Sequence, residues 1–456
     1  MKSTNKLNKI NQNIIMPLTL IVLPCLSMVA AHATPPWEQT HKILASDGEI
    51  GDGFGFSVAI SGNLAVIGEP LDANENGILS GSAYAFDITT GQQLFKFLAA
   101  DGESGDEFGI SVAASGNLVV IGAPADTDNG DASGSAYVFN ITTGQQIFKL
   151  LANDGQAGDT FGERVAIDGN LAVIGAAGDD DYGDNSGSVY VFDVTTGQQL
   201  FKLHATDGET LDKFGFSVAI HNNLAVIGAI DNVGNGTGSG SAYVFDVTTG
   251  RQLFEFDASD GAYQDSFGFS VAINDNLAVI GAPFDDNDNG AISGSAYVFD
   301  ITTGQPLFKL LTTDGADGDN FGYSVAISNN HAVIGTRFGD GNSVADSGSA
   351  YVFDITTGQQ VVKLFAADGE SSDEFGLSVA VSGNLVVIGA RYDDDNGFDS
   401  GSAYIFQQQP ANHLSVSPDP LIANQDGTFT ITQALPNALT GLIYSLDGLQ
   451  NTFIVN

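Results

Sequence analysis

The sequence predicts an all-β fold, a seven-bladed β-propeller of four-stranded antiparallel blades, on three observations. First, a stretch that opens with Phe-Gly recurs seven times, at intervals of 53 or 54 residues. Second, each copy holds four short runs of β-branched and aromatic residues separated by turn residues, without helical periodicity. Third, the last copy lacks its fourth run, while a matching run precedes the first copy. Four-stranded repeats of this length pack radially as propeller blades. The copies open at Phe54, Phe108, Phe161, Phe214, Phe267, Phe321 and Phe375.

The first 33 residues differ from the rest and predict a secretory signal peptide. Three lysines precede an apolar run over residues 14–31, and the Ala-His-Ala at 31–33 is a small-residue cleavage pattern. The rival interpretation is an uncleaved membrane anchor, which the two prolines in the run and the cleavage pattern disfavour. We therefore expect an exported protein, extracellular, cell-surface or periplasmic, with no membrane insertion after cleavage.

Composition excludes several classes of function. The single cysteine and all three methionines lie in the leader, so the mature chain has no disulfide, no thiolate nucleophile and no soft-metal site. Cleavage removes three lysines and no acidic residue, which changes the formal charge from -41 to -44. Such a surface repels nucleic acid and anionic lipid and attracts cations.

The strands of one repeat follow in order. In the first copy the expected strands are SVAI at 57–60, NLAVIG at 63–68, GSAYAFD at 81–87 and QLFKF at 93–97. The first two are joined by Ser-Gly-Asn, whose glycine and asparagine suit the positive φ of a tight hairpin. A short Thr-Thr-Gly turn joins the last two.

The ends of the propeller, residues 34–408, predict a closed ring. The seventh copy stops after GSAYIF at 401–406, and the orphan run His41–Leu44 stands where a fourth strand would. We expect this N-terminal strand to complete the last sheet, in a monomer. Residues 409–456 are expected to be a linker and a short β-rich C-terminal segment, marginal in size for an independent domain. This appendage would dock on the ring or be the stub of a larger β module.

The repeat resembles a known family. Phe-Gly followed by Ile-Gly-Ala-Pro, best preserved at 121–124 and 280–283, resembles the FG-GAP repeats of the integrin α-subunit head. The resemblance implies a β-propeller and suggests adhesion. Integrin-type repeats carry a calcium loop between the Phe-Gly strand and the Gly-Ala-Pro strand, where this chain has only a tight hairpin. The calcium ligands of the family therefore do not carry over.

A different loop, between the second and third strands, holds the candidate metal ligands. Its oxygen-bearing residues alternate and are followed by a glycine, as a hard cation such as Ca²⁺ requires. The alternative is that these residues only make good exposed turns. Copies four and six lack the pattern. The candidate ligands are Asp72, Asn74, Asn76, Asp126, Asp128, Asp179, Asp181, Asp285, Asn287, Asn289, Asp393 and Asp395.

The loop that enters the first strand of each copy is also acidic, as Asp47 and Asp52 illustrate. In an antiparallel sheet both loops lie at the same end, so one rim of the propeller should gather most of the carboxylates. Six lysines recur at one place in the fourth strand, and Glu255 takes that place in the remaining copy. A charge on this outer edge strand discourages edge-to-edge pairing. We expect the repeated Phe-Gly and Gly-Ala-Pro residues to be structural.

Residues that depart from the repeat are candidates for ligand binding. Arg337 and Arg391 replace the proline of Gly-Ala-Pro in the adjacent sixth and seventh copies, and the aromatic residues Phe338 and Tyr392 follow them. Such a group can receive a carboxylate, a sugar or a loop of a partner protein. The alternative is that both arginines form ion pairs with nearby acidic residues.

The function predicted is a binding or adhesion module for a protein or glycan ligand, with Ca²⁺ as the expected cofactor. We expect no enzyme activity, because the five mature histidines occupy unrelated repeat positions and no catalytic grouping recurs. Two alternatives stay open: a carbohydrate-active enzyme that uses a carboxylate pair on the rim, and a structural spacer at the cell surface.

Overall fold

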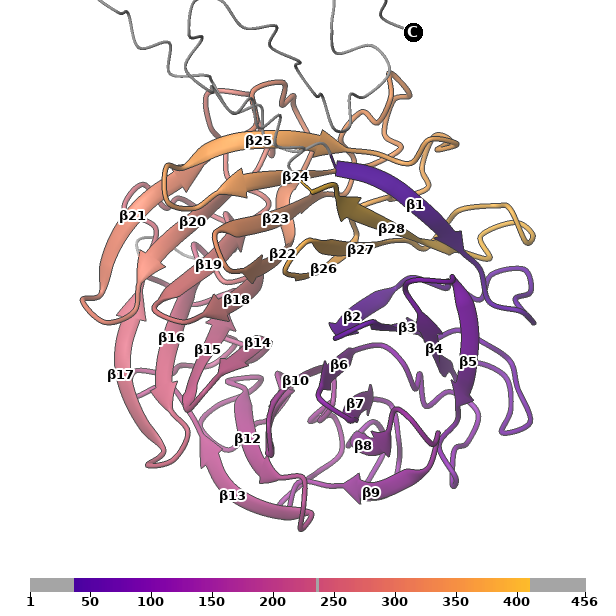
Figure 1. The fold of residues 1–456 in the computed structure, drawn as a ribbon. Coiled ribbons are helices and arrows are strands. Elements are labelled where there is room, and N and C mark those ends of the chain that lie inside the picture. Colours follow the sequence, from indigo (N-terminus) through magenta and orange to yellow (C-terminus); the bar gives the residue numbers. More distant parts are fainter. Residues whose placement is uncertain (1–36, 235–237, 411–456) are drawn as a thin grey trace, which may run out of the picture. The chain divides into compact units, whose positions relative to one another are not determined.

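The computed structural model describes residues 37–234 and 238–410, which form seven antiparallel sheets of four strands each (Figure 1). Within these residues no helix is long and apolar enough to cross a bilayer. The predicted signal peptide, and the predicted C-terminal segment beyond residue 410, lie outside the described residues. The all-β propeller is confirmed.

Blades 1 to 3 each use four consecutive strands. Their order in each sheet follows the chain order, from the centre of the ring outward. Blade 1 has β2 (Ser57–Ser61), β3 (Leu64–Glu69), β4 (Ser82–Asp87) and β5 (Gln92–Phe97). Blade 2 has β6 (Val112–Ser115), β7 (Leu118–Ala123), β8 (Ser135–Asn140) and β9 (Gln146–Leu150). Blade 3 has β10 (Arg164–Asp168), β11 (Leu171–Ala176), β12 (Ser188–Asp193) and β13 (Gln198–Leu203).

Blades 4 to 6 repeat this arrangement. Blade 4 has β14 (Phe214–His221), β15 (Leu224–Ala229), β16 (Ser241–Asp246) and β17 (Arg251–Phe256). Blade 5 has β18 (Ser270–Asn274), β19 (Leu277–Ala282), β20 (Ser295–Asp300) and β21 (Gln305–Leu310). Blade 6 has β22 (Phe321–Ser328), β23 (His331–Thr336), β24 (Ser349–Asp354) and β25 (Gln359–Leu364).

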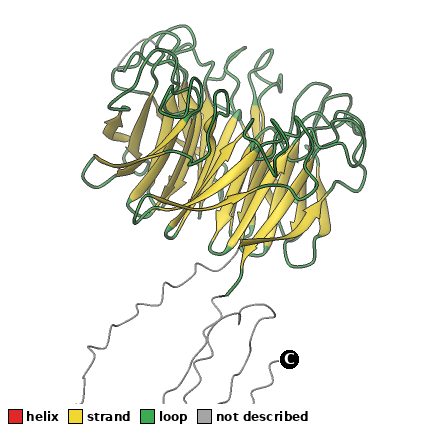
Figure 2. Cartoon of the chain, turned by 90° about the horizontal axis from the view of Figure 1, so that it is seen from above, coloured by secondary structure: helices red, strands yellow, loops and turns green. Residues whose placement is uncertain are grey.

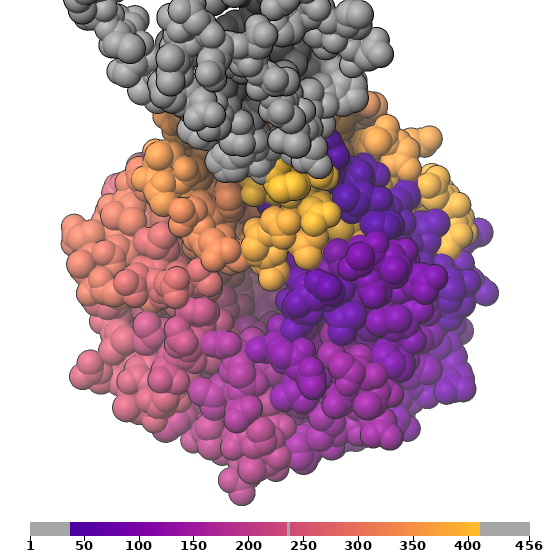
Figure 3. All heavy atoms as spheres, viewed as in Figure 1, coloured from indigo at the N-terminus to yellow at the C-terminus, as the bar shows by residue number. Residues whose placement is uncertain are grey.

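Blade 7 is closed by the N-terminal strand, as the sequence predicts. It has β26 (Ser378–Ser382), β27 (Leu385–Ala390), β28 (Ser402–Gln408) and, on its outer edge, β1 (Trp37–Ile43). The strands β1 and β28 are antiparallel, and Lys42 is paired with Tyr404. The indigo and yellow ends of the described chain therefore lie side by side (Figure 3).

The phenylalanine of each Phe-Gly pair is buried between two blades. Phe161 is 0% exposed and makes edge contacts with Tyr190 (5.4 Å between ring centroids) and Phe192 (5.8 Å) of its own blade. It belongs to one hydrophobic cluster with Val138 and Leu150 of blade 2. Edge-to-face aromatic packing of this kind adds to the stabilisation from burial. The repeated phenylalanine thus joins neighbouring blades.

The glycine that follows is required by a close backbone approach. Gly162 has φ +96°, and a Cβ at this position would lie 2.2 Å from the carbonyl oxygen of Ser135 in blade 2. A Cβ on Gly122 of blade 2 would in turn lie 1.8 Å from the Gly162 carbonyl oxygen. The Phe-Gly and Gly-Ala-Pro glycines of neighbouring blades therefore meet backbone to backbone.

The two ends of the sheets differ. Figure 2 shows longer loops along one side of the ring of sheets and short turns along the other. The longer loops are those between the second and third strands and those that enter the first strand of the next blade. They contact one another: Phe161 at the entry to β10 donates its backbone N–H to Ser133 (3.1 Å) in the loop of blade 2. We call this side the loop face.

Candidate functional site

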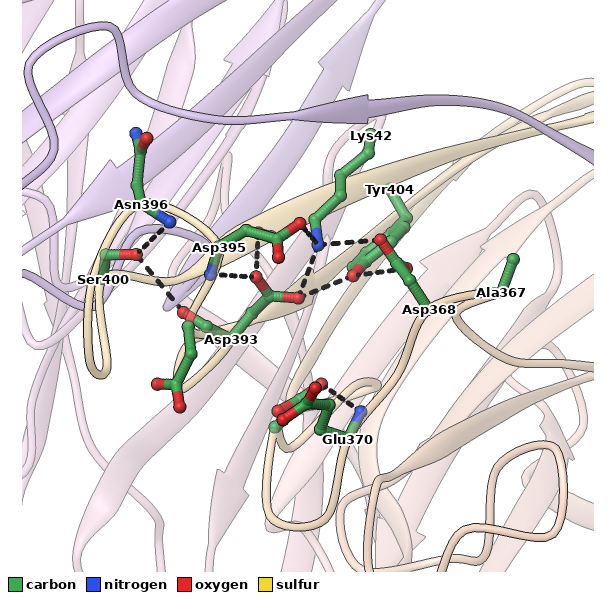
Figure 4. A network of polar contacts seen from close by, with 12 residues as sticks. Lys42, Ala367, Asp368, Glu370, Asp393, Asp395, Asn396, Ser400 and Tyr404 are labelled. Carbon is green, nitrogen blue, oxygen red and sulfur yellow. Dashed lines mark hydrogen bonds and ion pairs between the residues drawn. The ribbon is translucent and has the colours of Figure 1, made fainter.

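The lysine of the outer strand binds the carboxylates of the loop face. In blade 7 the Lys42 ammonium lies 2.8 Å from Asp393 and 3.0 Å from Asp368, and it also contacts Asp395 (Figure 4). Burial alone would lower the pKa of Lys42, but hydrogen bonds to these three aspartates raise it above its usual range. The Tyr404 hydroxyl donates to Asp393 at 2.7 Å. In blade 7 the predicted cluster of carboxylates on this rim is present, and the ammonium group of Lys42 lies in the middle of it.

Blades 2 and 3 have the same arrangement, which we call the lysine cage. Each ammonium is surrounded by three carboxylates, one from the loop that enters the blade and two from the loop between its second and third strands. Lys149 contacts Asp101 (2.8 Å), Asp126 (2.9 Å) and Asp128 (2.7 Å). Lys202 contacts Asp154 (2.9 Å), Asp179 (2.8 Å) and Asp181 (2.5 Å). The predicted metal ligands of blades 2, 3 and 7 are thus brought together around an ammonium group.

Blades 5 and 1 have a smaller cage, in which the lysine contacts two carboxylates. The asparagines predicted as metal ligands instead form hydrogen bonds that hold the loop. Lys309 contacts Asp260 (2.5 Å) and Asp285 (3.0 Å). The Asn287 amide donates to the Gly294 carbonyl at 2.7 Å, and its own oxygen accepts from the Asn289 backbone at 2.8 Å. In blade 1, Asn74 and Asn76 make the corresponding contacts. Blade 6 retains only the pair of Lys363 and Asp314 (2.7 Å).

Blade 4 is the exception, because Glu255 replaces the lysine. Burial and the charges of Asp207 and Asp257 raise the pKa of Glu255 to about 7. The position that holds an aspartate in blades 1, 2, 3, 5 and 7 holds Asn232 in blade 4, and its amide donates to the Tyr243 hydroxyl at 3.0 Å. Blade 4 therefore carries carboxylates where the other blades carry an ammonium.

Blade 1 also holds a buried acidic triad of Asp52, Glu69 and Asp72. One oxygen of each lies within 4.8 Å of the others. Glu69 is 0% exposed, and the Tyr84 hydroxyl donates to its Oε2 at 2.6 Å, whereas its Oε1 has no hydrogen-bond partner among the described residues. Burial, aided by the neighbouring charges of Asp72 and Asp52, raises the pKa of Glu69 to about 9. A buried group of three carboxylates can hold a metal ion.

An open pocket of ≈ 360 Å³ lies beside the triad. Its lining includes Asp72 of the triad together with Asp47, Glu75 and Lys96. Lys96 forms ion pairs with Asp47 (2.7 Å) and Asp72 (3.0 Å). Solvent and small ions therefore have a path to one member of the triad.

The two off-pattern arginines bind one buried glutamate. Arg337 contacts Glu374 from Nε (2.8 Å) and Nη2 (2.5 Å), and the Nε of Arg391 lies 2.9 Å from the other oxygen of Glu374. The side chain of Glu374 is 4% exposed, against 22% and 20% for the two arginines. The guanidinium groups also lie over the predicted aromatic neighbours, 4.6 Å from the Phe338 centroid and 4.3 Å from that of Tyr392.

These arginines belong to a longer row of aromatic and arginine side chains, which we call the inner belt. Its members lie beside the Phe-Gly pair, or in or just after the Gly-Ala-Pro segment, of blades 3 to 7 and blade 1, at the loop-face end of the innermost strands. The ring of Phe269 lies 5.2 Å from that of Phe216 and 4.8 Å from that of Tyr323. The belt comprises Arg164, Phe216, Phe269, Phe284, Tyr323, Arg337, Phe338, Glu374, Arg391, Tyr392 and Phe56.

Two comparisons with known proteins bear on this arrangement. A comparison with proteins of curated function gives no match. The family model described as FG-GAP repeat matches seven times, over residues 37–86, 92–139, 145–192, 198–245, 252–299, 307–353 and 359–406. Each match spans the outer strand of one blade and the first three strands of the next, and together the matches cover most of the chain. The chain therefore belongs to the FG-GAP repeat family, and its seven repeats form a seven-bladed β-propeller like the integrin α head.

Proposed function

We propose that the protein is an exported binding or adhesion module that captures a protein or glycan ligand at the inner belt, in a calcium-dependent manner. The observation that carries the proposal is the continuity of the belt. Ring and guanidinium contacts link residues from blade 3 through blade 7 to blade 1 on the loop face. Binding residues commonly lie on loops that a rigid scaffold positions.

The charge of the belt supports a ligand that carries an acidic group. Two guanidinium groups share the single carboxylate of Glu374, which leaves a net positive charge. Elsewhere on the loop face, six lysines are engaged by aspartates. An arginine beside aromatic rings can accept a carboxylate while the rings cover the apolar face of a sugar or side chain. An acidic glycan or an acidic peptide fits this chemistry.

The calcium part of the proposal is supported by the carboxylates of the same face. Hard cations prefer oxygen ligands, and the loop face carries many carboxylates. In blades 2, 3 and 7 one lysine ammonium already offsets part of the charge of the aspartate pair. The buried triad of blade 1, in which Glu69 has no such partner, offers the best support for a bound ion.

The test is a ligand screen of the mature chain on arrays of neutral glycans, acidic glycans and acidic peptides, with Ca²⁺ and with chelator. The variant Phe338→Ser/Tyr392→Ser truncates the belt and leaves the buried arginine and glutamate group in place. The control is Tyr263→Ser, which removes an aromatic ring that is 68% exposed outside the belt.

Capture of an acidic ligand that the belt variant loses and the control keeps supports the proposal. Capture that both variants keep contradicts the belt as the site. Turnover of a glycan would favour the carbohydrate-active enzyme, and the absence of any capture would favour the structural spacer.

A further inference from the structure

We propose that Asp52, Glu69 and Asp72 form a single divalent-cation site that blade 1 alone possesses, and that its ion is Ca²⁺. Glu69 follows the Ile-Gly pair of β3, at a repeat position where no other blade has an acidic residue. The residues at that position in blades 2 to 7 are Ala123, Ala176, Ala229, Ala282, Thr336 and Ala390. One departure from the repeat therefore creates the triad.

Among the described residues Glu69 has one hydrogen-bond partner, the Tyr84 hydroxyl at Oε2, and its other carboxylate oxygen is left without one. It is 0% exposed, and its Oε1 has no hydrogen-bond partner within residues 37–234 and 238–410. The ammonium of Lys96 pairs with Asp47 and Asp72, and no ion pair joins it to Glu69. Buried polar atoms are rarely left without a partner, and buried charges are paired or coordinate a metal. A cation bound between the three carboxylates would supply the missing partner.

The spacing of the triad suits Ca²⁺. The three ligand oxygens lie within 4.8 Å of one another. Calcium binds oxygen at about 2.3–2.6 Å, so ligands on opposite sides of the ion stand about 5 Å apart. The remaining positions can be filled by water from the pocket that Asp72 lines. Calcium accepts such mixed and irregular shells more readily than Mg²⁺, which demands a near-ideal octahedron at about 2.0–2.1 Å.

The site differs from the loops that the sequence singled out. Its ligands come from the entry loop (Asp52), the end of a strand (Glu69) and the third residue of the loop that follows (Asp72). The asparagines Asn74 and Asn76 are engaged in hydrogen bonds of their own loop. The inference deepens the calcium dependence proposed above by assigning it one site, and it does not depend on ligand capture at the belt.

The test is calorimetric titration of the chelator-treated mature protein with Ca²⁺ and, separately, with Mg²⁺. We expect one Ca²⁺ per chain and weaker binding of Mg²⁺. The variant Glu69→Ala restores the repeat's alanine and should weaken Ca²⁺ binding by at least about tenfold. The control Asp181→Asn changes an outer carboxylate of the blade 3 cage and should leave Ca²⁺ binding unchanged.

Thermal unfolding gives a second readout. Calcium should raise the Tm of the wild-type protein and leave that of Glu69→Ala unchanged. In chelator the variant should be at least as stable as the wild type, because it lacks the unpartnered carboxyl group. Equal Ca²⁺ affinity in both proteins, or no binding by the wild type, would overturn the proposal. The belt variant Phe338→Ser/Tyr392→Ser should still bind Ca²⁺, so failure of ligand capture and failure of this site are distinguishable.

Discussion

The ammonium of Lys202 lies 2.8 Å from Asp179, whose side chain is only 3% exposed. Asp154 and Asp181 complete the cage around the same nitrogen. The lysine thus provides a counter-charge for the buried carboxylate of Asp179. The same contact recurs in blades 2 and 7. In each of these blades a lysine ammonium group therefore lies among the carboxylates that the sequence predicts as metal ligands.

Replacing this lysine should destabilise the fold. In Lys202→Met the carboxylate of Asp179 keeps its buried position and loses its ion-pair partner, which costs about 3 kcal/mol. Urea unfolding monitored by circular dichroism measures the change. The matched control is Lys213→Met, whose ion pair with Asp231 is about 40% exposed on both sides and should contribute less than about 1 kcal/mol. Equal losses in the two variants would mean that the cage has no special role.

The same variant should acquire an affinity for calcium. Without the ammonium, Asp154, Asp179 and Asp181 form a set of three oxygen ligands with no counter-charge. Calcium at 100 times its dissociation constant would then stabilise Lys202→Met by about 2.7 kcal/mol through that site. Thermal unfolding with Ca²⁺ and with chelator measures the gain. The variant is made in the Glu69→Ala background, which removes the contribution of the blade 1 triad. If Ca²⁺ does not stabilise Glu69→Ala/Lys202→Met, the geometry of the cage does not suit a metal ion.

Blade 4 should give a pH-dependent stability. The folded protein raises the pKa of Glu255 to about 7, through burial and the charges of Asp207 and Asp257. In the unfolded chain Glu255 loses its proton near pH 4.3, whereas in the folded state it keeps the proton until about pH 7. The contribution of Glu255 to the free energy of unfolding is therefore present at low pH and is lost as the pH rises through about 7. Glu255→Gln should match the wild type at pH 5 and exceed its stability at pH 8.

Chemical denaturation at the two pH values measures this difference. The control is Glu209→Gln, an exposed residue of the loop that enters blade 4, which should show no such divergence. A wild-type protein that keeps the same stability relative to Glu255→Gln at both pH values would exclude the raised pKa.

The glycine of Phe-Gly should tolerate no side chain. Gly162→Ala would place a Cβ 2.2 Å from the Ser135 carbonyl oxygen at φ +96°, and the two blades would have to separate. Gly158→Ala has nearly the same backbone conformation, φ +92°, with nothing within 4 Å of the added carbon. The control should lose about 1 kcal/mol from strain alone. Gly162→Ala should lose several times more in urea unfolding, and equal losses would exclude the close approach as the reason for this glycine.

Much of the fold follows from the sequence because the repeat is explicit. The period of 53 or 54 residues, the tight turns and the orphan strand at His41 predict the blades, their number and the partner of the last strand. The turns are local features of the sequence, and the number of blades and the closing strand follow from the number and order of the repeated runs. None of these requires knowledge of side-chain contacts.

The lysine cage was harder to predict. The sequence interpretation assigned Lys202 and its counterparts to protection of an edge strand. The order of the runs in the repeat places these lysines on the outer strand of each blade, but it does not show which residues the ammonium group contacts. Their partners are distant in the chain: Asp179 lies 23 residues before Lys202, and Asp154 lies 48 residues before it. One signal was available, since the repeat with Glu255 in place of lysine is also one with Asn232 in place of aspartate.

The triad and the belt were missed for other reasons. Glu69 is visible as a departure from alanine, but its meaning depends on Asp52 and Asp72 coming within 4.8 Å of it. The aromatic residues after Phe-Gly, such as Phe269 and Tyr323, vary between copies, and only the packing of adjacent blades makes them neighbours. The arginines Arg337 and Arg391 were identified, whereas their shared partner Glu374 was not.

The pairing of β1 with β28 also governs when the protein can finish folding. The hydroxyl of Thr40 donates to the carbonyl oxygen of Ile405 across 365 residues of chain. Each of blades 1 to 6 is built from consecutive strands, whereas blade 7 needs both β1, the first strand to be synthesised, and β28, the last. Contacts of such long range fold slowly. A chain interrupted before residue 402 lacks β28, so its ring stays open and β1 has no strand to pair with.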